Sequence, residues 1–411
     1  MKLTSNFKIL FTNFTYLSVL QGLNMLFPLL TYPYLIRLFG SSVYGSYVFC
    51  NAIMTYVIMM INFGFNISAT KKISENRFDI CELSKIVSSI LYLKLIIFVS
   101  TFILVILFFI SFDFGRVDIR LFLALIGLCI QEIFFPLFFF QGIEKMKYIT
   151  LVNFCARLFY VITVFLIIRQ PNQILTLAIL NSSSCILASF FSIYLIYHFF
   201  ELKLVRVEFN RLKSDFLESV PFFFSRLSSV IVERSNVFIV GAFFDYSLVA
   251  IYDLCAKVVN LCSIPFALVA QVVYPNVAKT KNMVLIRSCY KYLVLIGLIL
   301  SFIVLLFADN IVLLLGGKQM IESADWLRIM IFYVPFTAVS SILGASTLVV
   351  NGFSKQYNLS NVLSLIVFIL LISIAYLLNS INFVTIAIAF VAPEMTIALY
   401  RRYITYKYNL I

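Results

Sequence analysis

The chain has 411 residues, of which 63% are hydrophobic and only 12% are charged, and its mean hydropathy is +1.04. Because soluble domains carry about 25% charged residues, this composition excludes an ordinary soluble protein. The formal net charge is +13. The basic residues are spread over short segments and form no single patch, so we expect no nucleic-acid partner.

Twelve apolar stretches follow one another along the chain. Each is long enough to cross a bilayer core as an α-helix, which takes about 20 residues, and each is too long and too continuously apolar for a barrel strand. The sequence therefore predicts an all-α integral membrane protein of about twelve spans. The predicted spans are 12–36, 43–68, 86–110, 120–140, 149–168, 174–199, 220–243, 249–274, 290–308, 327–350, 359–379 and 383–400.

The basic residues also orient these spans. Most of the 31 Lys and Arg residues lie in alternate connecting segments, and both termini belong to that basic set. Short segments rich in Lys and Arg stay in the cytoplasm, so we predict that the N- and C-termini are both cytoplasmic. The same segments are expected to attract anionic membrane lipids. The first span is too long for a cleaved signal peptide, and we expect it to remain as a helix.

Motifs of enzymes and metal sites are scarce. The single histidine, His198, and the one close cysteine pair, Cys255 and Cys262, do not form a metal-binding pattern. The sequence has no phosphate-binding glycine loop, and its predicted loops are too short to hold a catalytic domain. We therefore predict no enzymatic activity, no catalytic residue, no metal and no cofactor other than a coupling H⁺ or Na⁺.

The chain repeats itself weakly at an offset of 205 residues. Phe39, Ser42, Tyr47 and Cys50 align with Phe244, Ser247, Tyr252 and Cys255. The offset covers an even number of spans, which predicts a parallel repeat of the kind found in transporters. We predict two six-helix bundles, residues 1–205 and residues 206–411.

Charged residues inside predicted spans are the strongest functional signal. Each costs about 2.5–3.5 kcal/mol to insert, and such residues usually face the bundle interior or a wet cavity. Arg226, Glu233 and Arg234 lie in the seventh span and Arg157 in the fifth. Arginine binds phosphate in a bidentate manner and keeps its proton. This excess of arginine predicts a cavity for a polyanionic ligand.

Other charges in the spans have two interpretations each. Asp253 and Lys257 either neutralise one another as an i,i+4 pair or belong to the site. Lys94 is expected to snorkel toward the inner surface. Glu132 either pairs with Arg157 as internal scaffolding or serves transport. Candidate coupling-ion residues are Glu132, Glu233 and Asp253.

The first hairpin resembles a known family. The segments Leu29–Gly40, Tyr44-Gly45 and Asn62–Lys71 are similar to those of the bacterial O-antigen (Wzx-type) lipid-linked oligosaccharide flippases. These form the polysaccharide-transporter branch of the multidrug/oligosaccharidyl-lipid/polysaccharide exporter superfamily. Arg37, beside the Tyr32-Pro33-Tyr34 turn, matches the family motif, and Arg226 matches its seventh-span arginine.

The resemblance implies a fold and a function. The family fold has two six-helix bundles (MATE/MOP-like) around a central cationic cavity that opens to one side at a time. Its members move an undecaprenyl-diphosphate-linked oligosaccharide repeat unit from the inner to the outer leaflet of the bacterial inner membrane. We thus expect Arg226, Arg234, Arg157, Arg37 and Lys257 to contact substrate. The resemblance leaves open contact with other polysaccharide-assembly proteins.

Three other functions compete with this interpretation. A cation or drug antiporter of the same superfamily would need net acidic residues in its cavity, whereas arginine and lysine predominate in these spans. A membrane glycan polymerase or glycosyltransferase, which would be an enzyme, would need a sizeable loop. A passive channel does not account for the repeat.

Overall fold

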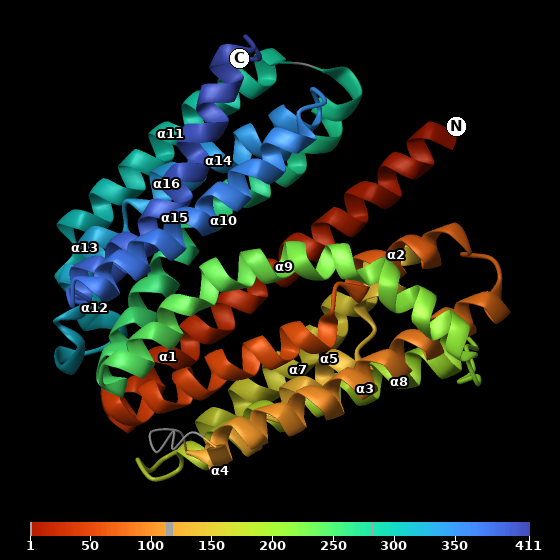
Figure 1. Cartoon of the computed structure of the whole chain (residues 1–411), viewed down its shortest axis with the longest axis horizontal. Helices are drawn as coiled ribbons and strands as arrows, with labels where there is room; N and C mark the ends of the chain where they lie inside the picture. The colour runs from red at the N-terminus through yellow and green to blue at the C-terminus, as the bar shows by residue number, and fades with distance from the viewer. Residues whose placement is uncertain (1, 112–117, 282) are drawn as a thin grey trace. The chain divides into compact units, whose positions relative to one another are not determined.

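The computed structural model describes residues 2–111, 118–281 and 283–411, and at some helical positions the side chain is left undescribed. The described residues fold into helices joined by short turns (Figure 1). Ten helical segments among them are long and apolar enough to cross a membrane. This confirms the prediction of an all-α, multi-pass membrane protein. The number of twelve spans and the side on which the termini lie stay predictions.

The helices follow the predicted spans closely. The first half contains α1 (Lys2–Asn62), α2 (Phe65–Glu75), α3 (Ile80–Ser111), α4 (Ile119–Ala124), α5 (Gly127–Phe134), α6 (Leu137–Gly142), α7 (Met146–Ile167) and α8 (Ile174–Phe199). The second half contains α9 (Phe209–Phe243), α10 (Tyr246–Thr280), α11 (Met283–Leu306), α12 (Ala308–Leu315), η1 (Lys318–Met320), α13 (Ser323–Met330), α14 (Tyr333–Leu343), η2 (Gly344–Val349), α15 (Ser354–Leu377) and α16 (Phe383–Lys407).

Two predicted spans are each divided into three helical pieces in the structure. The fourth is divided among α4, α5 and α6, and the tenth among α13, α14 and the π-helix η2. Hydropathy predicts that a segment crosses the membrane, but it does not register a break inside that segment. These interruptions matter because no water is available inside a bilayer to satisfy the exposed backbone groups.

Two glycines with positive φ divide the first hairpin. Gly40 has φ 76° and ψ 168° and kinks α1 at the predicted turn between the first two spans. A second break lies inside the predicted second span, where Phe63 has φ 42° and Gly64 has φ 79°. The sequence analysis missed this break because both residues belong to an apolar run. Glycine takes positive φ at little steric cost, which explains its presence at the two sharpest points.

The break at Gly64 accommodates the beginning of α9. A Cβ atom on Gly64 would lie 2.7 Å from Cβ of Phe222 and 2.9 Å from the carbonyl oxygen of Ser219. The Phe63 ring stacks on the rings of Phe216 and Phe223, with centroid distances of 4.5 Å to each. Close backbone approach and aromatic packing thus fix the first turns of α9 on the end of the second span.

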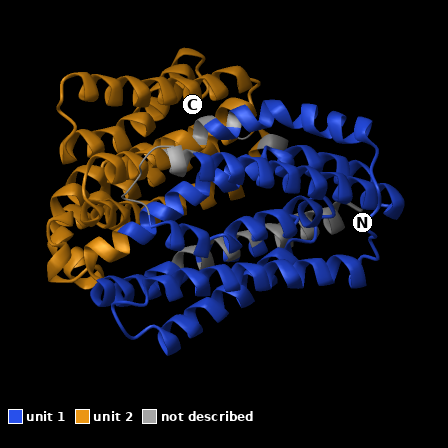
Figure 2. Ribbon diagram, turned by 60° about the horizontal axis from the view of Figure 1, so that its bottom comes forward, with its two compact units in different colours: residues 1–39, 46–227 blue, residues 40–45, 228–411 orange. Residues whose placement is uncertain are grey.

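The chain divides into two compact units, shown in separate colours in Figure 2. Unit 1 comprises residues 1–39 and 46–227, and unit 2 comprises residues 40–45 and 228–411. The helix α9 therefore begins in one unit and ends in the other, and the turn at 40–45 packs with unit 2. The repeat-based division at residues 205 and 206 stays a prediction.

We expect Gly64→Ala to destabilise the protein. The substitution forces alanine into a left-handed conformation, at about 1–2 kcal/mol, and also places its methyl group against the backbone of α9. The measurement is the midpoint of thermal unfolding in detergent. Gly22→Ala is the matched control, since a Cβ atom there meets nothing within 4 Å. Equal midpoints for the two variants would contradict this account of the break.

Candidate functional site

The arginines predicted to contact substrate are accessible. Arg37 on α1 and Arg226 on α9 are exposed, and Arg157 on α7 is half-buried; all three belong to unit 1. In unit 2, Arg234 on α9 is exposed. Among the side chains that the structure describes, none forms an ion pair with Arg157 or Arg226. The role of both residues in binding stays a prediction.

Asp253 and Lys257 form the expected pair on α10. Lys257 Nζ donates a hydrogen bond to Asp253 Oδ2, and both side chains are largely buried. Lys257 Nζ also lies 3.4 Å from the hydroxyl oxygen of Tyr44 and 5.5 Å from the centroid of its ring. Because Tyr44 belongs to the turn that packs with unit 2, this pair fastens the turn while neutralising itself. Contact between Lys257 and substrate stays a prediction.

The burial of Lys94 shows that the expected snorkelling is wrong. Its side chain is 0% exposed, and its Nζ lies 2.7 Å from Glu132 Oε1. Asn62 donates a further hydrogen bond of 2.8 Å to the same oxygen. The expected scaffold pair of Glu132 with Arg157 is therefore wrong, since Lys94 is the partner. A buried ammonium group needs a compensating charge, and the span that follows α3 supplies one.

A proline explains why lysine is required at this place. In a regular helix the carbonyl of Glu132 would accept a bond from the N–H of residue 136, but Pro136 has none. Lys94 Nζ donates to that carbonyl oxygen at 2.7 Å, in addition to its bond with the carboxylate. One ammonium group thus satisfies both the charge and the backbone acceptor at the end of α5.

Two of the three coupling-ion candidates have a cationic partner in the structure. Glu132 is held by Lys94 and Asp253 by Lys257, so each carboxylate already has a fixed cationic partner. The side chain of Glu233 lies outside the described residues. None of the three is thereby established as an ion site.

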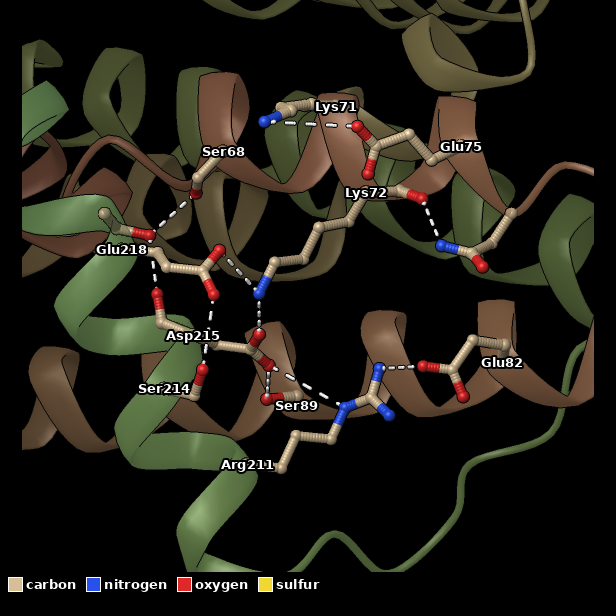
Figure 3. A network of polar contacts seen from close by, with 12 residues as sticks. Ser68, Lys71, Lys72, Glu75, Glu82, Ser89, Arg211, Ser214, Asp215 and Glu218 are labelled. Atoms are coloured by element: carbon tan, nitrogen blue, oxygen red, sulfur yellow. Dashed lines mark hydrogen bonds and ion pairs between the residues drawn. The ribbon is translucent and has the colours of Figure 1, made fainter.

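A polar network that the sequence analysis missed fixes the beginning of α9 (Figure 3). Asp215 is 3% exposed and accepts bonds from Lys72 on α2, at 2.5 Å, and from Ser89 on α3. Arg211, one turn before Asp215, contacts Glu82 of α3 at 2.6 Å. Asp215 precedes the predicted seventh span, which begins at residue 220, and only the packing of α9 on α2 and α3 reveals its burial.

The network continues to both sides of Asp215. Lys72 Nζ also lies 2.8 Å from Glu218, and this hydrogen bond lowers the pKa of the Glu218 carboxyl below its usual value. Before α9, the backbone N–H groups of Lys203 and Val205 donate to serine hydroxyls of α3, at 3.1 and 3.0 Å. The connector between the two halves is therefore tied to unit 1 along its length.

A second missed cluster lies in unit 2, around Arg401. The sequence analysis counted Arg401 among the basic residues of the C-terminus, but it is only 6% exposed and lies beside α14 and α15. Arg401 donates a hydrogen bond to the backbone carbonyl of Ser340 on α14. Glu394, seven residues earlier on α16, accepts a hydrogen bond from the hydroxyl of the same serine. A charge count cannot identify such a cluster, because it depends on where α16 packs.

Buried charge pairs and interrupted spans are typical of multi-pass membrane transporters. The sequence matches the family described as "Polysaccharide biosynthesis protein" over residues 10–281, and the chain belongs to this family.

Known proteins agree with this assignment. The chain is 26% identical over 357 residues to the "Putative O-antigen transporter" of Escherichia coli (strain K12), which covers 84% of this chain and 85% of that protein. Its fold is similar to an inward-facing multidrug resistance MATE family transporter of the MOP superfamily (TM-score 0.74, 15% identity, 95% and 98% of the two chains). It is also similar to the lipid II flippase MurJ in an inward closed conformation (TM-score 0.69, 16% identity, 97% and 87%). The MATE/MOP-like fold is thereby confirmed.

We expect Lys94→Met to lower the free energy of unfolding by about 3–5 kcal/mol, because it leaves the Glu132 carboxylate buried without its partner. The double variant Lys94→Met/Glu132→Gln removes both charges and should recover part of this loss, with the unpaired carbonyl still costing about 1–3 kcal/mol. Thermal unfolding in detergent measures both. Additive effects of the two single substitutions would contradict a direct pair.

Proposed function

We propose that the protein is a flippase for a lipid-linked oligosaccharide. Its substrate would be an undecaprenyl-diphosphate-linked O-antigen or related polysaccharide repeat unit, moved from the inner to the outer leaflet of the bacterial inner membrane. Family membership and the O-antigen transporter relative support this proposal. The observation that supports it best is that Arg157 and Arg226, both within predicted spans, have no ion-pair partner among the described side chains.

The charge balance suits a diphosphate headgroup. The intramembrane lysines, Lys94 and Lys257, are neutralised by Glu132 and Asp253 within their own units. Arg157 and Arg226 remain without an ion-pair partner among the described side chains. Their guanidinium groups would replace the water that a diphosphate loses on leaving the cytoplasm. Arg37 and Arg234 would add positive charge, each within its own unit. The prenyl tail would stay in lipid throughout.

Transport would proceed by alternating access. The headgroup would enter from the cytoplasm, and movement of one unit against the other would then open the path outward. The helix α9 would transmit this movement, since it belongs to unit 1 up to residue 227 and to unit 2 from residue 228. Its turns up to Phe223 are held by Asp215 and by the contacts at Gly64, so the bending would occur beyond them. The coupling ion would be H⁺ or Na⁺.

The cation antiporter is the main alternative, and the fold alone does not separate it from a flippase. Such a transporter needs net acidic residues in its cavity. The two described candidates, Glu132 and Asp253, are each occupied by a lysine. A glycan polymerase is less suited still, because the relatives are described as transporters and flippases, and we propose no catalytic residue.

We expect Arg226→Ala to reduce surface O-antigen display by at least about tenfold, with Arg226→Lys intermediate because lysine keeps the charge but loses bidentate binding. The measurement is surface glycan in the native host after deletion of the gene and complementation, at matched protein levels. Arg169→Ala is the control, since Arg169 is exposed in the turn between α7 and α8.

Lipid analysis of the deletion strain completes this test. Accumulation of one lipid-linked repeat unit on the inner leaflet would support the flippase. Full display by both Arg226 variants would remove this residue from the site. Unchanged repeat-unit lipids and unchanged surface glycan in the deletion strain would reject the function itself.

A further inference from the structure

Glu394 is a carboxyl group that the proposed transport path does not use. It lies on α16, directly after Pro393 and within a predicted span, and its Oε1 accepts a hydrogen bond from the hydroxyl of Ser340 on α14. Tyr333, at the start of α14, and Arg401, two turns further along α16, are the other ionisable groups near it. On α15 the nearest ionisable group is Tyr357, whose ring lies 4.5 Å from the Arg401 guanidinium carbon.

Arg401 does not neutralise Glu394 directly. Its Nε donates to Ser360 at 3.0 Å, its Nη1 to the carbonyl oxygen of Ser340 at 2.8 Å, and its Nη2 to Asn361 at 3.1 Å. In the described part of the chain, Glu394 forms no ion pair. Arg401 is thus satisfied by neutral oxygens, and the Glu394 carboxyl is bonded to the hydroxyl of Ser340.

A hydroxyl partner has a chemical consequence. It donates a hydrogen bond to a carboxylate and accepts one from a carboxylic acid, so it fits the group in both protonation states. Glu132 and Asp253 lack this freedom, because an ammonium group can only donate. Among the described carboxyls within the predicted spans, Glu394 is therefore the one whose surroundings accept gain or loss of a proton.

Ser340 connects this carboxyl to an interrupted helix. Its hydroxyl contacts Glu394 and its carbonyl oxygen contacts Arg401, one turn before Gly344 ends α14 with ψ −115°. The chain continues as the π-helix η2, a geometry that is rare and often found at functional sites. A Cβ atom on Gly344 would lie 2.7 Å from Arg401 Nη1. Any change of charge on Glu394 thus acts beside the point where the tenth span changes its winding.

We propose that Glu394 is a reversible proton-binding site, and that its protonation changes the balance of contacts at Ser340 and so the geometry of α14 and η2. A proton taken up there enters from solvent and leaves to solvent, with no other group transferred. Its use to drive transport rests on the proposed function, whereas the proton binding itself does not. The proposal selects H⁺ over Na⁺ as the coupling ion.

Infrared difference spectra of the purified full chain between acid and alkaline buffer test proton binding directly. The wild type should show a carbonyl band of a protonated carboxyl that disappears at alkaline pH. Glu394→Gln should lack this band, and Ser340→Ala should shift it to higher frequency, because a hydrogen bond to the group is lost. Glu322→Gln, which removes an exposed carboxyl, should leave the band unchanged. An unaltered band in both Glu394→Gln and Ser340→Ala would overturn the proposal.

Flipping of the lipid-linked repeat unit in proteoliposomes tests the coupling. The wild-type rate should change by about tenfold with an imposed pH gradient, and that of Glu394→Gln by less than about twofold. Equal responses of the two proteins would overturn the coupling role. Absence of flipping by the wild type would instead count against the proposed function, and the infrared result would still decide on the proton site.

Discussion

The constraint on which this structure depends is the absence of water inside the bilayer, where every backbone carbonyl and every charge must find its partner within the protein. A proline in the fourth span removes one backbone donor, and Lys94 replaces it while pairing with the carboxylate of the same residue, Glu132. In the tenth span, Arg401 donates to a backbone carbonyl beside the change from α-helix to π-helix. In each unit a buried cation therefore stabilises an interrupted helix.

This constraint sorts the intramembrane charges by role. Lys94, Lys257 and Arg401 have their donors occupied by acceptors within their own units, and removing any of them would leave buried groups unsatisfied. Arg157 and Arg226 have no ion-pair partner among the described side chains. A charge that costs insertion energy without serving the fold is best explained by a ligand. The distinction depends on contacts, since all five residues are similar in a sequence.

Much of the fold was predictable, because hydropathy registers each helix independently of its neighbours. The start and end of α8 and the start of α16 coincide with their predicted spans. Two features could not be predicted, the break at Gly64 and the pairing of Lys94 with Glu132, because both depend on which helices pack against one another. The burial of Arg401 was missed for the same reason, because a count of basic residues near a terminus does not show how α16 packs. The aligned residues Tyr47 and Tyr252 are both buried, which agrees with the predicted repeat without proving it.

The central claim is that Arg157 and Arg226 face water that a diphosphate can enter, whereas Lys94 does not. Single cysteines at positions 157, 226 and 94, in a variant without the native cysteines, can be tested with a membrane-impermeant thiol reagent in intact membrane vesicles. The account predicts rapid labelling at 157 and 226, slowed by an excess of polyprenyl diphosphate, and no labelling at 94. Failure to label 157 and 226 from either side of the membrane would show that these positions face lipid, and would contradict the account.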